Sequence, residues 1–375
     1  MKQTSRIIST YSADVFGVCS ALFELGGMTV MHDASGCTST YTTHDEPRWY
    51  DMDSMVFISG LSEMEALMGD DEKLIGDIVT AAGELRPAFI ALSGTPIPAM
   101  TGFDYEAAAR IIEDRTGIPA MGFATTGMHT YIHGASMALA ELARRFVRGD
   151  VPKRERPCVN ILGLTPLDFS VNGTDQSITD FLEKQGYEVL SHWAMGSTLE
   201  EISLSAGAHV NLVVSAAGLE AAKVLQDRFG TPFVVGVPYG EKFGNMLENS
   251  LRSGNIPALP EFAGDDIFII GEGVTSLSLA RAIELETGRS ARVLCTTECD
   301  ATLLREKDRL CRFEEELEGA LKTAKTIIAD PMFRPICPEN AKFVSLPAES
   351  CSGRIWRERI PNLVRDFLDF IRQVL

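Results

Sequence analysis

Short apolar runs alternate with amphipathic helical patterns from one end of this 375-residue chain to the other. Such alternation is typical of parallel sheets built from βα units, so we expect an α/β fold. The runs predict strands near residues 28–32, 54–59, 88–93, 118–122, 158–163, 188–193, 209–215, 232–237, 267–273, 290–295, 326–331 and 342–347. The helical patterns lie near residues 62–83, 104–116, 131–148, 175–186, 199–206, 218–229, 241–253, 274–286, 302–322 and 358–374.

Two segments rich in charge, Gly and Pro interrupt the alternation, at residues 143–157 and 253–266. They divide the pattern into three repeated Rossmann-like units. We therefore predict an N-terminal α/β domain over residues 1–152, a middle domain over residues 153–260 and a C-terminal domain over residues 261–375. The amphipathic terminal helix is expected to pack back across them.

Charge and composition argue against a nucleic-acid-binding, membrane-spanning or secreted protein. The net charge of −18 opposes non-specific binding to nucleic acid. No apolar run approaches the roughly 18 residues that would suggest a membrane span, and the start MKQTSRIIST lacks the apolar core of a signal peptide. The expected location is the cytoplasm. The eight cysteines contain no C-x-x-C pair, so most are expected to be buried and reduced.

The segment MTVMHDASGCTSTYTTHDEPRW (28–49) is the first candidate site, because an apolar strand there leads into a polar loop with a thiol. Ligands in open α/β sheets bind beyond the carboxyl ends of strands. Acidic and basic side chains lie close together in this loop, and such a cluster could change the pKa of a thiol or transfer protons. Asp45 and Glu46 could instead only cap the turn before Pro47. The polar residues in question are His32, Asp33, Gly36, Cys37, His44, Asp45, Glu46 and Arg48.

Three other motifs have a structural interpretation that we favour. IIGEG (269–273) has Ser276 where a dinucleotide-binding fingerprint would have its third glycine, and no P-loop motif occurs in the chain. Cys295 and Cys299 form one isolated C-x-x-x-C, which is weak evidence for a metal site. His129 and His133 could face one way at the entry of a helix, although helix-cap contacts explain them as well.

Several blocks occur in an order that is typical of one family. The most specific is the H-x-x-x-G-C spacing of His32, Gly36 and Cys37 after an apolar segment. The later blocks are LSEMEALMGDDEKL (61–74), SGTPIPAMTGFD (93–104), GFATTGMHTYIHGAS (122–136), RFGTPFVVGVPYGEKF (228–243), IIGEGVTSLSLARAIELETG (269–288) and IIADPMFRP (327–335). In these blocks the chain resembles the nitrogenase component 1 family, which includes the molybdenum-iron protein subunits and the reductases of protochlorophyllide, chlorophyllide and nickel-sirohydrochlorin diamide.

The resemblance implies an obligate dimer with an iron-sulfur cluster at the subunit interface. The cluster would receive electrons from a separate ATP-dependent P-loop iron-sulfur reductase. Cys37 matches a cluster-ligating cysteine of the family, whereas Ser12 and Ala13, and Thr95 or Pro96, stand where two further cysteines would be. A four-iron cluster normally takes four cysteines, so an identical or related partner subunit would have to complete it. Oxygen ligands could also contribute, and the candidates are Asp14, Asp33 and Asp45.

The implied function is that of a nitrogenase-like oxidoreductase subunit with an unidentified substrate. His44, Asp45 and Glu46 would then handle protons near the metal centre at Cys37. The candidate cofactor-binding residues are His32, Gly36, His129, His133 and Tyr239. The alternative is a non-catalytic scaffold of the same fold, which holds a metal cofactor or a tetrapyrrole.

Overall fold

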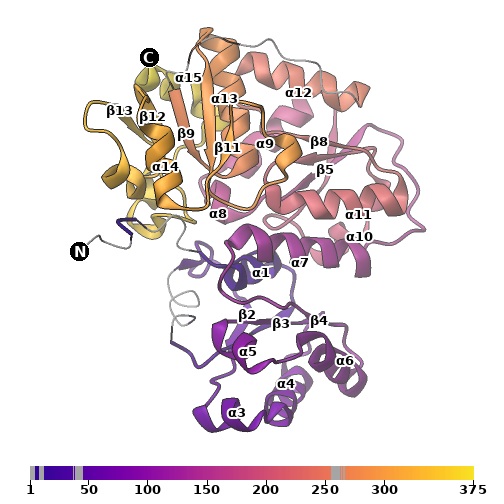
Figure 1. Cartoon of the computed structure of the whole chain (residues 1–375). Coiled ribbons are helices and arrows are strands. Elements are labelled where there is room, and N and C mark those ends of the chain that lie inside the picture. The colour runs from indigo at the N-terminus through magenta and orange to yellow at the C-terminus, as the bar shows by residue number, and fades with distance from the viewer. Residues whose placement is uncertain are drawn as a thin grey trace.

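The structure is a computed structural model that describes residues 5–7, 12–36, 38, 45–254, 262, 264 and 267–375. Its strands form three sheets in which every pair of neighbours is parallel (Figure 1). The expected fold class, three Rossmann-like parallel-sheet units, is thereby confirmed. None of the helices in the described part of the chain has the length and apolar character needed to cross a lipid bilayer.

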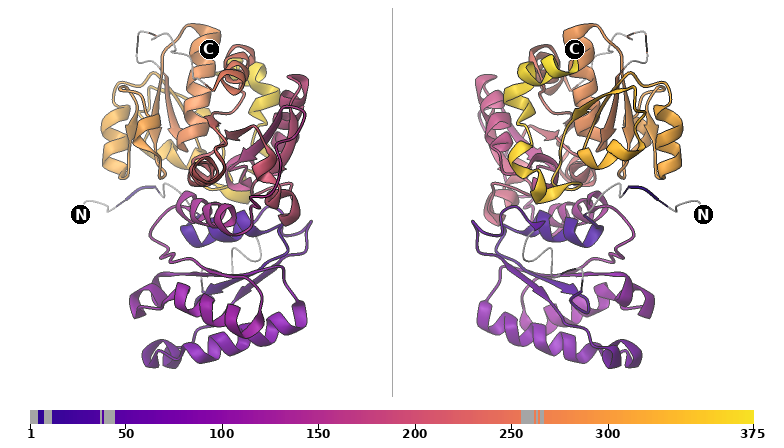
Figure 2. Two further views of the ribbon diagram at one scale, coloured as in Figure 1. Left: turned by 90° about the vertical axis from the view of Figure 1, so that its right-hand side faces the viewer. Right: turned by 90° about the vertical axis from the view of Figure 1, so that its left-hand side faces the viewer.

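The N-terminal unit has a four-stranded sheet in the order β2-β1-β3-β4. Helices α4 and α6 cover its lower face in Figures 1 and 2, and α1 and α7 cover the face toward the rest of the molecule. All residues of β1 and β3 are buried, as expected for a parallel sheet between two helical layers. The elements are α1 (Asp14–Leu22), β1 (Met28–His32), β2 (Met55–Ile58), α3 (Glu63–Met68), α4 (Asp71–Leu85), β3 (Ile90–Gly94), α5 (Pro96–Thr101), α6 (Tyr105–Thr116), β4 (Ala120–Gly122) and α7 (Tyr131–Arg145).

The middle unit has a second four-stranded sheet in the order β6-β5-β7-β8. Strands β5 and β7 are buried along their whole length, so this sheet is also covered on both faces. Its elements are β5 (Cys158–Leu162), α8 (Pro166–Phe169), α9 (Thr174–Lys184), β6 (Glu188–His192), α10 (Leu199–Ser203), β7 (Val210–Val213), α11 (Leu219–Phe229), β8 (Phe233–Val235) and α12 (Glu241–Ser253).

The C-terminal unit has a five-stranded sheet in the order β11-β10-β9-β12-β13. Its last helix packs against α9 of the middle unit, and one buried apolar cluster extends through both units. The elements are β9 (Ile267–Gly271), α13 (Gly273–Thr287), β10 (Ala291–Cys295), β11 (Arg309–Leu310), α14 (Glu314–Leu321), β12 (Thr326–Ala329), β13 (Lys342–Ser345) and α15 (Leu363–Val374). The domain boundaries after residues 152 and 260 remain predictions.

The predicted helix over residues 302–322 is wrong. The segment instead forms a 3-10 turn, the short strand β11 and the helix α14. Arg305 donates hydrogen bonds to the carboxylates of Asp308 and Glu284, and Asp308 accepts one from the backbone N–H of Val293 in β10 (2.8 Å). These buried polar contacts hold the segment against the edge of β10, and they outweigh its helical charge pattern.

Two predicted helices have different limits. The helix predicted over residues 62–83 is divided at Gly69, whose φ of 65° lies in the left-handed region and ends α3. The helix predicted over residues 358–374 begins only at Leu363, after Pro361, and the side chain of Asn362 caps it.

Helices α1 and α7 pack with backbone against backbone. A Cβ atom on Gly17 would lie 1.9 Å from the carbonyl oxygen of Tyr131, and one on Gly134 would lie 1.8 Å from that of Asp14. The backbone N–H of Tyr131 donates to the carbonyl of Ser12 (3.0 Å), which fixes the start of α7. On its other side α7 packs against α11 of the middle unit. Helix α7 therefore connects the N-terminal unit to the rest of the molecule.

We expect Gly134→Ala to destabilise the fold by about 3 kcal/mol, because the new methyl group has no space against the backbone of α1. The measurement is the free energy of unfolding in urea. Gly83→Ala on the exposed face of α4 is the control, since nothing lies within 4 Å of its Cβ position. That change should stabilise the protein by about 0.5 to 1 kcal/mol. Equal effects of the two changes would contradict the close helix packing.

Candidate functional site

His32 ends β1 at the carboxyl edge of the N-terminal sheet. Its Nδ1 lies 2.9 Å from the hydroxyl of Ser59, and its ring packs against Phe103 at 4.6 Å between centroids. Burial lowers the pKa of His32 to about 4, so the imidazole is neutral at pH 7. Gly36 is exposed a few residues further along, while Cys37 and His44 lie outside the described residues.

Asp33 joins the ends of two strands at this edge. One carboxylate oxygen accepts a hydrogen bond from the hydroxyl of Thr95 (2.7 Å), which follows β3, and the other accepts one from Thr38 (2.6 Å). By the predicted correspondence with the family, a third cysteine would fall at Thr95 or Pro96. The Thr95 hydroxyl donates to a carboxylate.

Side chains with oxygen atoms also lie at the start of α1, near the place where the resemblance predicts another ligand. Ser12 is buried before α1, and the carboxylate of Asp14 accepts from the backbone N–H groups of Thr126 (3.0 Å) and Gly127 (2.8 Å). Cys19 is fully buried inside α1, where burial raises the pKa of its thiol to about 12. The described residues at this edge thus supply hydroxyl and carboxylate oxygens but no thiolate, and the role of Cys37 as a cluster ligand remains a prediction.

Glu46 has a structural partner in Arg48. The Arg48 guanidinium donates to Glu46 (2.7 Å) and Glu24 (2.8 Å), and all three side chains are buried or nearly so. Arg48 also donates to the carbonyl oxygen of Ala194 in the middle unit (2.8 Å). This geometry gives Glu46 a role in holding the loop, and Asp45 is partly buried beside it. Catalytic roles for Asp45 and Glu46 remain predictions.

His129 and His133 lie together at the start of α7, with ring centroids 4.4 Å apart. Nδ1 of His129 lies 3.4 Å from the carboxylate of Glu298 in the C-terminal unit. Both histidines line an open cleft between the two units, together with Cys299. This cleft adjoins the pocket of Tyr239, because Thr296 and Thr297 line both.

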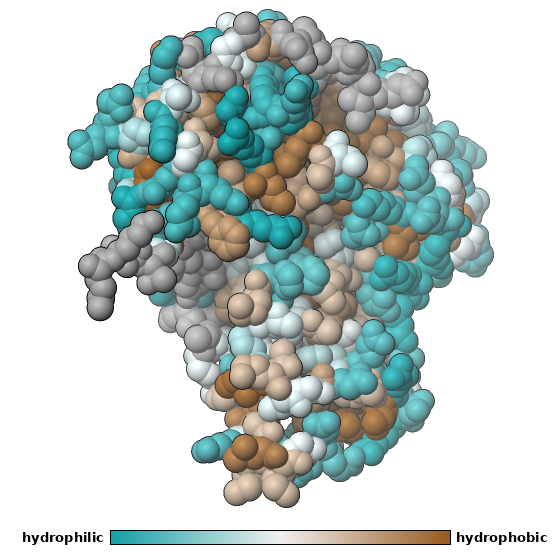
Figure 3. Space-filling view, in the orientation of Figure 1, coloured by the Kyte–Doolittle hydropathy of each residue, from teal (hydrophilic) through white to brown (hydrophobic). Residues whose placement is uncertain are grey.

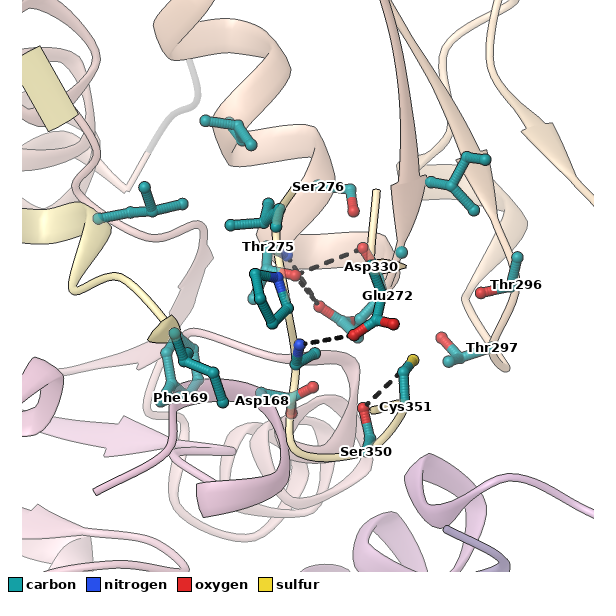
Figure 4. A pocket seen from close by; sticks show the side chains of 18 of the residues that line it. Asp168, Phe169, Glu272, Thr275, Ser276, Thr296, Thr297, Asp330, Ser350 and Cys351 are labelled. Atoms are coloured by element: carbon teal, nitrogen blue, oxygen red, sulfur yellow. Dashed lines mark hydrogen bonds between the residues drawn. The ribbon is translucent and has the colours of Figure 1, made fainter. Parts of the chain in front are cut away.

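Tyr239 lines a pocket of about 90 Å³ between the units (Figure 4). Tyr131 reaches it from the N-terminal unit, Asp168 from the middle unit, and Glu272 and Asp330 from the C-terminal unit. Strands of the middle and C-terminal units end toward this pocket, as expected for a ligand site in parallel α/β sheets. None of the described residues that line it is Lys, Arg or His.

Asp168 is the most perturbed acid of the pocket. Its carboxylate accepts hydrogen bonds from the hydroxyls of Tyr131, Thr165 (2.8 Å) and Ser215 (2.7 Å). Burial and the negative charge of Glu272 raise the pKa of Asp168 to about 7, although the three hydrogen bonds favour the charged form. The carboxyl group can therefore hold or release a proton near neutral pH.

Glu272 and Asp330 are held by backbone N–H groups. Glu272 caps α13 by accepting from Val274 (3.0 Å), and it also accepts from Ala216 of the middle unit (2.9 Å). Asp330 accepts from the backbone N–H of Ala348 (2.9 Å). Helix N-termini and backbone donors stabilise negative charge, so these hydrogen bonds hold the two carboxylates in fixed positions in the wall of the pocket.

Three hydroxyl groups of the pocket have no hydrogen-bond partner within the described part of the chain. They belong to Tyr239, Ser276 and Thr296, and each of these residues is at least nine-tenths buried. Burial raises the pKa of Tyr239, as do the nearby charges of Glu272 and Asp168, so its phenol keeps its proton. Buried hydroxyls normally find a partner, so these groups are available to a bound ligand or to water.

Sequence reasoning named Tyr239 as a cofactor-binding candidate, a role that remains a prediction, but it did not single out the acids around it. Asp168, Glu272 and Asp330 each follow a buried apolar strand closely, and this pattern in CVNILGLTPLD, IIGEG and IIADP was the available signal. Tyr131 gave no such signal, because its place in the pocket depends on how α7 packs between the units.

A family model described as nitrogenase component 1 type oxidoreductase matches residues 14–243. The nitrogenase iron-molybdenum cofactor biosynthesis protein NifE of Clostridium pasteurianum is 24% identical over 185 residues, which cover 49% of this chain and 40% of that protein. A subunit of the light-independent protochlorophyllide reductase of Rubrivivax gelatinosus is 29% identical over 161 residues, which cover 36% of this chain and 30% of that protein. The chain thus spans less than half the length of these two relatives.

Among solved structures, one titled nitrogenase Cp1 at pH 6.5 superimposes with a TM-score of 0.74. The sequences are 15% identical, and the superposition covers 100% of this chain and 94% of the other. This likeness shows that the fold is shared.

Asp168→Asn should change how stability depends on pH. The pKa of Asp168 in the folded protein, about 7, lies above that of the unfolded chain, so the folded state binds the proton more tightly. Its contribution is fully present below about pH 4 and is lost as pH rises through 7. The unfolding free energy of the variant minus that of the wild type should rise by roughly 2 to 4 kcal/mol from pH 4 to pH 8.

Urea denaturation over this pH range provides the measurement. Asp180→Asn, at an exposed position on α9, is the control and should follow the wild type at every pH. Parallel curves for Asp168→Asn and the wild type would contradict a proton-binding carboxyl group in the pocket.

Proposed function

The chain belongs to the nitrogenase component 1 type oxidoreductase family, and on this basis we propose that it is a subunit of a nitrogenase-like oxidoreductase. It would take electrons from an ATP-dependent iron-sulfur reductase and deliver them to a ligand in the pocket between the units. The observation that carries this proposal is Asp168, a buried carboxyl group with a pKa of about 7 beside three hydroxyls that have no partner in the described chain.

Reduction of a bound ligand consumes protons as well as electrons. A general acid works best when its pKa lies near the working pH, and Asp168 meets this condition. When it releases its proton, the hydroxyls of Tyr131, Thr165 and Ser215 stabilise the carboxylate that remains. Tyr239 would orient the ligand by hydrogen bonding. The pocket lies between units and is lined mostly by buried residues, which would limit access of water to the reaction.

An iron-sulfur cluster, when bound, would supply one-electron transfer at the carboxyl edge of the N-terminal sheet. Cys37 would be its ligand in this chain, with His32 and Gly36 beside it. Ser12 and Thr95 offer hydroxyls, and Asp33 is already engaged by Thr95 and Thr38. Because such clusters normally take four cysteines, the remaining thiolates would come from a second subunit, identical or related.

An exposed apolar surface supports a dimer. Met64, Leu67 and Met68 on α3 and Met100 on α5 are between 68% and 86% exposed. Figure 3 shows apolar side chains gathered on the front of the N-terminal unit. Apolar surface of this kind marks contact with another protein.

A cofactor-biosynthesis function is the second candidate. It is favoured by the similarity to NifE and by the oxygen groups that stand in place of two family cysteines. In that case the pocket would hold a metal cofactor or a tetrapyrrole without reducing it.

We expect the anaerobically purified chain with its partner subunit to oxidise a reduced P-loop iron-sulfur protein only when ATP is supplied. This chain has no P-loop of its own to couple ATP hydrolysis to electron transfer. The absorbance of the reductase reports its oxidation. Oxidation at equal rates with and without ATP would contradict the oxidoreductase proposal, and no oxidation at all would favour cofactor biosynthesis.

Cys37→Ala should remove the iron that copurifies with the complex, because it deletes the one thiolate that this chain offers at the interface. Iron and sulfide analysis, with circular dichroism as a check on folding, tests this. Cys337→Ala, at a half-buried position beside Phe333, is the control and should keep its iron. Unchanged iron in the Cys37 variant would overturn the assignment.

A further inference from the structure

Cys295 and Cys299 are neighbours in space as well as in sequence. Cys295 ends β10 and is fully buried, whereas Cys299 is half-buried in the turn that follows. A Cβ atom on Gly273 would lie 2.4 Å from Sγ of Cys299 and 3.5 Å from Sγ of Cys295. Both sulfurs therefore fill the space that Gly273 leaves open at the start of α13.

The two thiols differ in access. Cys299 lines the open cleft between the N-terminal and C-terminal units, and Cys295 does not. Within the described residues, no group of three or more His, Cys, Asp or Glu side chains is arranged to hold a metal ion. A structural zinc site takes four such ligands, so the pair is not explained as part of one. A close pair with one accessible thiol is the arrangement used for disulfide exchange.

We propose that Cys295 and Cys299 form a reversible disulfide by exchange with an external disulfide such as oxidised glutathione. The sulfur of Cys299 attacks the external disulfide, forms a mixed disulfide and releases one thiol. The sulfur of Cys295 then attacks Sγ of Cys299, closes the bridge and releases the second thiol. The two cysteines lose two electrons and two protons, and the external disulfide gains both.

The bridge would act on a turn that contacts two sites. Thr296 and Thr297, between the cysteines, line the pocket of Asp168. Glu298, in the same turn, accepts a hydrogen bond from the backbone N–H of Thr130 (3.1 Å) at the start of α7. Formation of the disulfide would therefore make the contact between the C-terminal and N-terminal units at this turn sensitive to redox conditions. The inference does not depend on the proposed function.

Mass spectrometry of the wild-type full chain tests the proposal. Trypsin releases residues 293–305 as one peptide that contains both cysteines. After treatment with oxidised glutathione and N-ethylmaleimide under denaturing conditions, this peptide should carry no label and be lighter than the reduced peptide by two hydrogens. Prior dithiothreitol should restore two labels. Cys337, half-buried elsewhere, should be labelled in both samples.

Two variants test the order of attack. Cys295→Ser should retain glutathione on Cys299, because no second thiol resolves the mixed disulfide. Cys299→Ser should leave the buried Cys295 free of glutathione. A wild-type peptide that carries two maleimide labels after oxidation, or that retains glutathione on Cys299, would overturn the proposal.

Discussion

The rest of the structure depends on the packing of helix α7 (Tyr131–Arg145) against two partners at once. Gly17 and Gly134 let α7 meet α1 without side chains between them, and its opposite face packs on α11 of the middle unit. Close backbone packing leaves little freedom of angle between the units. It also places Tyr131, the first residue of α7, in the pocket that the middle and C-terminal units form.

The acids of the molecule differ in how their charge is stabilised. Asp14, Glu272 and Asp330 accept hydrogen bonds from backbone N–H groups. Asp168 accepts side-chain hydrogen bonds only from hydroxyls, and it faces the charge of Glu272. Burial and the charge of Glu272 raise the pKa of Asp168 to about 7, so this carboxyl group is suited to carry a proton.

The sequence predicted the fold well because strand and helix patterns are local. Buried apolar runs identified all three sheets, and the error at residues 302–322 arose where Arg305 and Asp308 make long-range buried contacts. The site was less predictable. The raised pKa of Asp168 depends on burial and on the charge of Glu272 from another unit, and no local pattern encodes them. Cys37, which belongs to the block most specific for the family, and His44, a candidate catalytic residue, lie outside the described part of the chain.

The two ends of the proposed electron route are connected through Ser12. Its carbonyl oxygen accepts from the backbone N–H of Tyr131, and its own N–H donates to the carbonyl of Ser350 at the rim of the pocket (3.2 Å). The hydroxyl of Tyr131 in turn donates to Asp168. Ser12, which with Ala13 lies where a family cluster ligand is predicted, is thus hydrogen-bonded to the residue that contacts the acid of the pocket. Two hydrogen bonds therefore lead from Ser12 to Asp168 through the Tyr131 residue: one at its backbone N–H and one at its hydroxyl. If electrons enter at the edge of the N-terminal sheet, this path would connect the point of entry with the proton of Asp168.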